Sequence, residues 1–540
     1  MIGILAWCVV GPLLAGAIAL AAPARWARWL ALGGSLVPLV AGGGFLAGFA
    51  AVPDAGFRGL EHHPWSTALG AGWTLGVDAP GAAMLALAGL VTLIATISGW
   101  RQERQPRAYH ALVMLLLAAM DGVFTTLDLL VFTACWEIML IPMLVLIGLW
   151  GGEQRRYAAL KFFLVTLAGG AALILLLVGL WWAQPAGGRT VTIDAAATVR
   201  LAGPAPERIH GLPAAIQADG SARVAVPRSL DVRLLTLQWR ELGATRILGI
   251  SLATLGFLAV ALACLVKIPA VPLHTWLPHA HVQAPTAVSV LLAGILLKLG
   301  VFGLWRIAWP LFPQAAVAWA PLLGGLGLAG LLWTAWVALG QRDLKRLVAY
   351  SSVSHMGWCL IGLASLTTAG ALGALVQAVA HGFSSSLLFL LVGVIYDRAH
   401  HRRVDGFGGL IVPMPRFTWI LVIACLAGAG LPGLAGFVGE FLAFTGAATA
   451  GGGWAWVAAA AALSVVLSAA YNLWALKRVA FGPLRHPEQG AFPDLDRREL
   501  AATLPLVALL LLVGLWPGPL INALRPAVEA MTAHVAGAMP

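Results

Sequence analysis

Long apolar segments recur along almost the whole chain, and each is long enough to cross a lipid bilayer as a helix. A membrane-spanning helix needs about 20 predominantly apolar residues, and fourteen segments come close to this length. They are residues 2–22, 30–52, 80–99, 109–126, 128–150, 158–183, 247–268, 285–307, 316–339, 346–366, 370–396, 416–446, 453–476 and 500–520. The pattern predicts an all-α membrane protein with about fourteen transmembrane helices.

Composition excludes a water-soluble fold. Of the 540 residues, 60% are hydrophobic and 10% are charged, whereas a typical globular protein carries about 25% charged residues. The net charge of +11 would suggest nucleic-acid binding in a soluble chain, but orientation in the bilayer explains it here, so no nucleic-acid partner is expected. The five cysteines are scattered through apolar stretches without a C-x-x-C pair, which argues against disulfides and bound metal.

The basic residues gather in alternate loops between the predicted spans. The positive-inside rule places such loops in the cytoplasm, so both chain termini are expected outside. The clusters are Arg25 and Arg28; Arg101, Arg104 and Arg107; Arg155, Arg156 and Lys161; Arg342, Lys345 and Arg346; Arg398, Arg402 and Arg403; and Lys477, Arg478 and Arg485. Because the first apolar stretch is followed rather than preceded by positive charge, a retained span is favoured over a cleaved signal peptide.

One polar segment interrupts the series of spans. Residues 184–246 are rich in Gly, Pro and Arg and contain alternating runs such as ARVAVPRSLDVRLL. Long loops cross the membrane regardless of their charge, so this insertion is expected outside, as a small β-hairpin with a surface helix. Its function is not readable from the sequence.

Two of the predicted spans carry helix-breaking residues in corresponding places. The first contains Pro269, Pro272 and Pro278, and the second contains Pro432 among several glycines. Proline removes a backbone donor and clashes with the preceding turn, and open backbone at membrane depth is tolerated only against protein or a water-filled cavity. Paired breaks predict two inverted repeats, each with a transport site. Kinks that serve helix packing alone are the alternative.

The repeats divide the chain into four parts. We expect N-terminal helices over residues 1–108, a first inverted repeat over 109–307 that includes the polar insertion, and a second repeat over 308–476. A cytoplasmic loop and a C-terminal transmembrane helix then follow over residues 477–540.

Six ionisable residues fall inside predicted spans, and we interpret them as a proton relay. They are Glu137, Lys267, Lys298, His355, His381 and Glu440. A lone charge at mid-bilayer costs at least about 2.5–3.5 kcal/mol, so these side chains must share partners and water. A lysine beside a carboxylate keeps its proton, and a lysine isolated in an apolar site releases it more readily. Opening and closing of a Glu137–Lys267 pair would therefore pass a proton on to Lys298.

Structural roles are the alternative for each of these residues. Glu137 and Lys267 would then form a pin between helices, and the two histidines would be hydrogen-bonded core residues. Arg306, near the end of its span, is expected to be an interfacial anchor. Asp121 and Asp128 are expected to be span-end residues.

Five segments carry a family resemblance. They read WEIMLIPMLVLIGLWGG, RYAALKFFLVTLAGG, KIPAVPLHTWLPHAHVQAPTAVSVLLAGILLKLG, LVAYSSVSHMG and GLPGLAGFVGEF. Over about residues 80–480 the chain resembles the antiporter-like subunits of respiratory complex I. Within that family it is most similar to the M-type chains, because Glu440 stands where the L-type and N-type chains and the Mrp-type antiporters have lysine.

The resemblance implies a proton-translocating subunit of an NADH–quinone oxidoreductase in a bacterial inner (cytoplasmic) membrane. It implies a Glu137–Lys267 pair, a bridge of Lys298 and histidines, and Glu440 as the terminal acid on the outer side. The chain would be a translocase subunit without a redox centre, and NADH, FMN, iron–sulfur clusters and quinone would belong to partner subunits. The expected partners are other membrane subunits of complex I, especially neighbouring antiporter-like chains.

Two other classes of function compete with this interpretation. The same relay would serve a subunit of an Mrp-type Na⁺/H⁺ antiporter or of a membrane-bound hydrogenase. A membrane enzyme acting on lipid-linked substrates would need clustered carboxylates of the D-D-x-x-D type, which the sequence does not contain.

We predict that a cysteine placed in the 101–107 loop reacts with a membrane-impermeant thiol reagent only from the cytoplasmic side. The basic cluster of this loop should hold it there. Labelling intact cells and inside-out vesicles in parallel measures the side, and labelling in intact cells would invert the predicted orientation.

Overall fold

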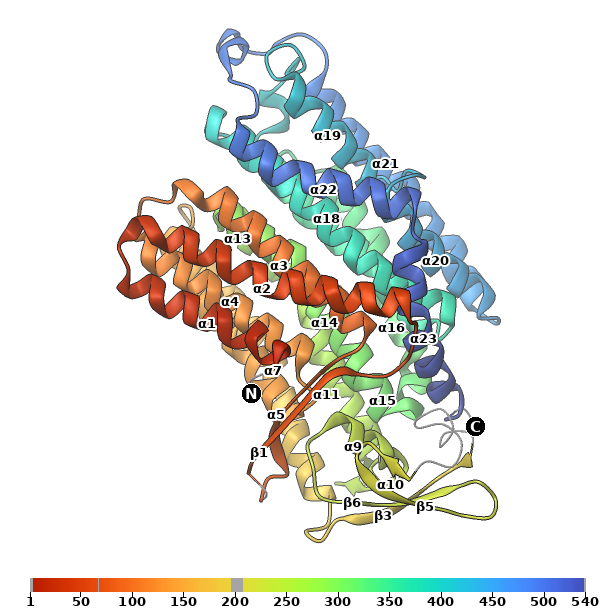
Figure 1. Ribbon diagram of the computed structural model, residues 1–540. Coiled ribbons are helices and arrows are strands. Elements are labelled where there is room, and N and C mark those ends of the chain that lie inside the picture. Colours follow the sequence, from red (N-terminus) through yellow and green to blue (C-terminus); the bar gives the residue numbers. More distant parts are fainter. Residues whose placement is uncertain (1–2, 67, 196–206, 539–540) are drawn as a thin grey trace.

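The computed structural model describes residues 3–66, 68–195 and 207–538, and these form an elongated bundle of helices with a small strand-rich region at one end (Figure 1). Within these described residues, twelve helices are long and apolar enough to cross a membrane. Two shorter apolar helices, Leu252–Lys267 and Pro415–Gly428, lie in the remaining two predicted segments. The predicted all-α membrane fold is confirmed, whereas fourteen crossings and two inverted repeats stay predictions.

The described part of the first half of the bundle contains eight α-helices of varied length and one 3-10 turn. These are α1 (Ile4–Ala21), α2 (Ala24–Ala51), α3 (Ala79–Ser98), the 3-10 turn η1 (Gly99–Arg101), α4 (Pro106–Thr125), α5 (Leu129–Ile138), α6 (Leu140–Trp150), α7 (Arg155–Ala183) and α11 (Leu252–Lys267). Pro142 lies in the first turn of α6, where its ring disfavours a continuous helix through the preceding residues. One predicted span is therefore divided into α5 and α6.

The remaining elements run from the centre of the bundle to the C-terminal part. They are η2 (Leu273–Thr275), α12 (Trp276–Gln283), α13 (Thr286–Leu291), the π-helical turn η3 (Leu292–Leu296), α14 (Leu297–Gly303), the π-helical turn η4 (Leu304–Ala308), α15 (Trp309–Leu311), α16 (Pro313–Leu339), α17 (Leu344–Ala364), α18 (Thr368–Ala399), η5 (Val404–Gly406), α19 (Pro415–Gly428), α20 (Ala435–Thr449), α21 (Trp454–Ala480), η6 (Pro487–Ala491), α22 (Arg497–Leu515) and α23 (Gly518–Ala536). Helix α23 was not predicted, because its apolar positions are interrupted by charged and polar ones.

Both predicted helix breaks are present. Helix α11 ends at Lys267, and the chain resumes as α12 only at Trp276. Helix α19 ends at Gly428 and α20 begins at Ala435. Between them Gly430 and Gly433 adopt φ values of +72° and +93°, which glycine reaches without the steric penalty of a Cβ atom.

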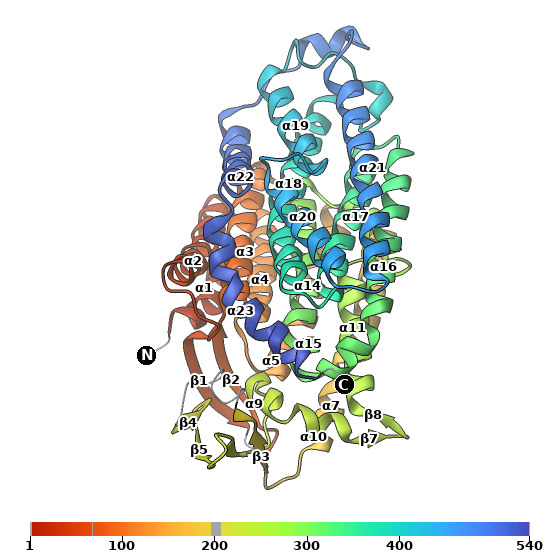
Figure 2. The same cartoon turned by 90° about the vertical axis from the view of Figure 1, so that its right-hand side faces the viewer.

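The strands gather at one end of the bundle, which we call the strand end (Figures 1 and 2). We call the opposite end the basic end, because Arg101, Lys345 and Arg398 from three of the basic loop clusters line one cavity there. A hairpin of β1 (Arg58–Ser66) and β2 (Ala71–Val77) lies at the strand end. The polar insertion adds β3 (Arg189–Ile193), β4 (Arg208–Ile209), β5 (Leu212–Ile216), β6 (Ala222–Val226), α9 (Val232–Leu237), α10 (Trp239–Ala244), β7 (Arg246–Ile247) and β8 (Ile250–Ser251). A small β-hairpin with a surface helix was expected, whereas the observed unit is a four-stranded sheet in the order β3-β6-β5-β4 with two short helices.

Burial is greatest in three central helical segments. The apolar windows of Thr286–Leu311 and Thr368–Ala399 are completely buried, and that of Leu344–Ala364 is 94% buried, against 28% for Ala24–Ala51. These three segments carry Lys298, His381 and His355. Half of the predicted relay therefore lies on helices at the buried centre of the bundle (Figure 2).

Close contact between α18 and α20 depends on glycine. A Cβ atom at Gly439 would lie 2.6 Å from the Cα of Gln377, and one at Gly373 would meet the backbone of Ala443. Only glycine lets the two backbones approach so closely, and this approach brings Glu440 beside Gln377.

We expect Gly439→Leu to destabilise the protein by about 1–3 kcal/mol, because the added side chain overpacks this contact. Gly325→Leu on α16 is the matched control, since no atom lies within 4 Å of a Cβ placed there. Thermal unfolding of the two purified variants measures the difference. Equal stability would contradict the packing argument.

Candidate functional site

Lys298 lies in the first turn of α14, directly after the π-helical turn η3, and its side chain is completely buried. Its ammonium group donates to the carbonyl oxygen of Ala293. It also lies 2.8 Å from Nδ1 of His381 on α18. With Lys298 charged, His381 accepts at Nδ1 and a neutral His381 carries its own proton on Nε2. The predicted bridge between Lys298 and a histidine is thus formed by direct contact.

A second contact of the same kind joins His355 and Glu440. Nδ1 of His355 on α17 lies 2.8 Å from Oε1 of Glu440 on α20. The same oxygen accepts a hydrogen bond of 3.2 Å from Nε2 of Gln377. The hydroxyl of Tyr471 on α21 lies 3.5 Å from Nε2 of His355. The buried carboxyl group therefore has two side-chain partners, as a buried polar group requires.

The two histidines connect these pairs. Their ring centroids are 5.6 Å apart and the rings are tilted by 40°, so the two imidazoles are direct neighbours. The structure thereby brings together four of the six predicted residues in the order Lys298, His381, His355 and Glu440. Each member can both accept and release a proton.

Glu137 and Lys267 are arranged differently. Within the part of the chain that the structure describes, no ion pair of 4.0 Å or less joins them. The Nζ of Lys267 lies over the ring of Trp136 at 5.1 Å, which is a cation–π contact. The carboxylate of Glu137 faces Gly170, where a Cβ atom would collide with Oε1. Glu137 and Lys267 therefore do not form an ion pair in this structure. Lys267 instead contacts Trp136, the residue before Glu137.

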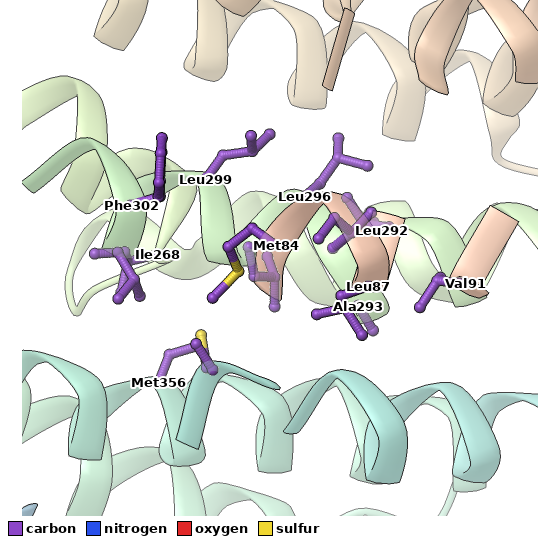
Figure 3. Packing of buried hydrophobic residues seen from close by; sticks show 14 of the residues in the cluster. Met84, Leu87, Val91, Ile268, Leu292, Ala293, Leu296, Leu299, Phe302 and Met356 are labelled. Atoms are coloured by element: carbon purple, nitrogen blue, oxygen red, sulfur yellow. The ribbon is translucent and has the colours of Figure 1, made fainter. Parts of the chain in front are cut away.

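Apolar side chains pack closely around the central lysine helix. Figure 3 shows Ile268, Leu299 and Phe302 together with Met84 of α3 and Met356 of α17. Ile268 directly follows Lys267 along the chain, and Leu299 directly follows Lys298. No hydrogen bond links Lys267 to Lys298 among the described residues. The relay requires a proton to pass between Lys267 and Lys298, and these two side chains are not in hydrogen-bonding contact in this structure.

Two buried basic side chains toward the basic end were not chosen from the sequence. His281 on α12 is completely buried, stacks on Phe389 at 4.3 Å, and both of its ring nitrogens lack a partner among the described residues. Lys345 was predicted in a basic loop cluster, but it is buried in the first turn of α17 and donates to the carbonyl of Ala284 at 2.5 Å. Lys345 was missed because its place in a charged loop suggested an exposed side chain. His281 was missed because the sequence does not distinguish it from His279, two residues earlier.

Lys345 lines a large cavity at the basic end. Its volume is about 1000 Å³, and Asp397, Arg498 and Glu499 also line it. Polar walls and a volume of this size admit many water molecules. The cavity therefore brings solvent from the basic end to the buried side chain of Lys345.

Three residues were expected near span ends, and Arg306 is the one whose surroundings differ from the prediction. Arg306 is not an interfacial anchor, because it is 3% exposed and its guanidinium pairs with Asp78 at 2.5 Å. Asp128 caps α5 by accepting from the amides of Leu130 and Val131. Asp121 is completely buried, and neither carboxylate oxygen has a partner within the described residues.

Comparison with known proteins identifies the family. The family described as "NADH:quinone oxidoreductase/Mrp antiporter, TM" matches residues 126–203 and 229–468, so the match omits the middle of the polar insertion. The chain is 37% identical over 504 residues to a Rhodobacter capsulatus protein named NADH-quinone oxidoreductase subunit M, covering 93% of this chain and 90% of that protein. It is 35% identical to a Synechococcus protein named NAD(P)H-quinone oxidoreductase chain 4 1, covering 98% and 93%.

Solved structures agree with this assignment. A chain of respiratory complex I from Thermus thermophilus with bound NADH is 29% identical, with a TM-score of 0.79 and coverage of 98% of this chain and 99% of that one. A chain of the Mrp complex from Dietzia sp. DQ12-45-1b shares the fold at 19% identity, with a TM-score of 0.77 and 99% coverage of both chains. The resemblance found in the motifs is confirmed, and the chain belongs to the NADH:quinone oxidoreductase/Mrp antiporter family of membrane proteins.

Proposed function

We propose that this chain is the M-type, proton-translocating subunit of a respiratory NADH–quinone oxidoreductase. The buried line from Lys298 through His381 and His355 to Glu440 carries the proposal. It crosses four helices at the centre of the bundle and consists of groups that bind and release protons. The full-length similarity to proteins named subunit M supports the choice of complex.

The proposed contribution of this chain is proton transfer. We assign NADH, FMN, iron–sulfur clusters and quinone to partner subunits, as the family resemblance implies. Moving one charge against 100 mV costs about 2.3 kcal/mol, and that energy must arrive from those partners through the membrane contacts.

Glu137 and Lys267 are the proposed switch of the relay. Lys267 lies over Trp136 rather than against Glu137, so the pair is open in this structure. Closing the pair would hold a proton on Lys267, and opening it would favour release toward Lys298. The six residues together form the proposed relay.

The proposed orientation follows the distribution of charge. The basic end faces the cytoplasm of a bacterium and the strand end faces outward, as does the N-terminus. Protons enter through the cavity beside Lys345, and Glu440 is the terminal acid toward the outer side.

An Mrp-type Na⁺/H⁺ antiporter subunit or a membrane-bound hydrogenase subunit is the second candidate. The fold shared with a chain of the Mrp complex supports it. The acid at position 440 and the high identity to subunit M proteins favour the oxidoreductase. Co-purification with flavin and iron–sulfur subunits would distinguish the two.

We expect Glu137→Ala and Lys267→Ala each to abolish most proton pumping in the assembled complex, because either change removes one side of the switch. Ile138→Ala is the matched control, since it shortens an adjacent uncharged side chain on α5. Proton uptake into vesicles driven by NADH measures the effect. Near-normal pumping by an assembled Glu137→Ala complex would reject the relay.

We expect Glu440→Lys to impair turnover, because an ammonium group would replace the acceptor that both His355 and Gln377 contact. Glu440→Gln is the companion variant, which keeps the shape but cannot carry a proton. NADH oxidation coupled to quinone reduction measures the loss. Unchanged turnover in Glu440→Lys would show that the terminal-acid role is wrong.

A further inference from the structure

A second cavity lies at the strand end, away from the relay. Its volume is about 600 Å³, and it is enclosed by the loop before β1, α9, α10, η4 and α23. Its rim includes the exposed residues Ala55, Gly56 and Arg240, whereas Asp78, Trp305 and Arg306 form a buried floor. The cavity therefore leads from the surface of the strand end to an ion pair at the end of the membrane helices.

The floor pair leaves one carboxylate oxygen available. Asp78 accepts from Nη2 of Arg306 at 2.5 Å and from the amide of Gly81 at 2.8 Å. Both bonds end on Oδ1, so Oδ2 has no hydrogen-bond partner among the described residues. Asp78 lines the cavity, and water in the cavity can reach Oδ2. The carboxylate is thus held in place through Oδ1, and Oδ2 is left without a protein partner on the side of the cavity.

Arg306 anchors this carboxylate from the helix that carries the central lysine. Its guanidinium lies over the rings of Phe57 and Phe302 at 4.9 and 4.8 Å. Lys298 precedes Arg306 by eight residues, roughly two helical turns, and the π-helical turns η3 and η4 lie on either side of α14. Such turns occur frequently at functional sites.

An aromatic barrier lies between the lysine and the cavity. Phe302 is completely buried and packs edge-on against Phe124, with centroids 5.1 Å apart. Phe302 is four residues from both Lys298 and Arg306 along the helix. Phe302 therefore lies along the helix between Lys298 and the floor pair, where a change in its rotamer would alter the packing between them.

Several other ionisable groups of the cavity are paired, uncharged or exposed, and Glu241 also lines it, half-buried on α10. Asp54 is paired with Arg58 at 2.5 Å, and Arg233 is paired with Asp231 at 2.6 Å. Burial, with a smaller contribution from the charge of Arg233, lowers the pKa of His210 to about 4, so this imidazole is uncharged at neutral pH. Asp194 is exposed at the rim. Asp78 remains as the carboxylate at the floor.

We propose that this cavity is a release vestibule for protons and that Asp78 is the group that passes them to it. A proton leaving Lys298 crosses the Phe302 position, binds Oδ2 of Asp78 and is then given to cavity water, which restores the carboxylate. Arg306 is a positioning residue that holds Oδ1. This inference rests on the proposed proton translocation and adds a route that does not pass through Glu440.

The first test blocks the cavity from outside. Ala530 on α23 lines the cavity and is half-buried, and the five native cysteines are all buried, so an Ala530→Cys variant offers one reactive thiol. We expect a bulky, membrane-impermeant methanethiosulfonate reagent to label it and to reduce NADH-driven proton pumping in the assembled complex. Removing the reagent with a reductant should restore pumping, which separates blockage from misfolding.

Asp219→Cys is the matched control, because Asp219 is exposed in the turn between β5 and β6 and does not line the cavity. Mass spectrometry verifies labelling of both variants. Full pumping by the labelled Ala530→Cys complex, or failure of this thiol to react, would overturn the vestibule. In either case an active unlabelled complex would leave the proposed translocation intact.

Asp78→Asn tests the carrier itself. The amide retains an acceptor for Gly81 and Arg306 but cannot take up a proton, so we expect proton pumping per NADH oxidised to fall in an assembled complex. Arg306→Lys should keep part of the pumping, since a cation would still hold Oδ1. An assembled Asp78→Asn complex with the normal ratio of protons to NADH would contradict the role of Asp78.

Discussion

A buried ammonium group must be given partners, and the centre of this protein is organised around that requirement. Lys298 is completely buried, where an isolated charge would cost at least several kcal/mol. The carbonyl of Ala293 and the imidazole of His381 both contact the ammonium group, so its charge is not isolated. Because His381 also faces His355, and His355 faces Glu440, satisfying one lysine produces a line of exchangeable protons across four helices.

The helices are shaped to allow these contacts. The π-helical turn η3 directly precedes the segment that bears Lys298. Gly439 and Gly373 allow α18 and α20 to approach closely enough for Gln377 to reach Glu440. Breaks after Lys267 and before Ala435 place the ends of helices beside buried charge, where open backbone can be accommodated by protein or water. Features that weaken regular helices thus position the relay.

Hydrophobic periodicity and break-forming residues were sufficient to predict the helical fold, and the cost of buried charge was sufficient to select the six relay candidates. The contacts among them depend on tertiary packing, which one sequence does not reveal. Lys345 belongs to a basic cluster in the sequence, yet it is buried against Ala284. Arg306 lies near a predicted span end, but Asp78, 228 residues away, removes it from the interface. Lys267 lies over the ring of Trp136 and does not form the ion pair that was expected with Glu137.

Proton transfer along the proposed relay requires water wherever neighbouring relay side chains are not in hydrogen-bonding contact. High-resolution electron cryomicroscopy of the assembled complex would show ordered water between His381 and His355 and along a route from Lys267 to Lys298. The account predicts bridging density at both places in at least one state of the working enzyme. Continuous, tightly packed apolar side chains between Lys267 and Lys298 in every state would contradict it.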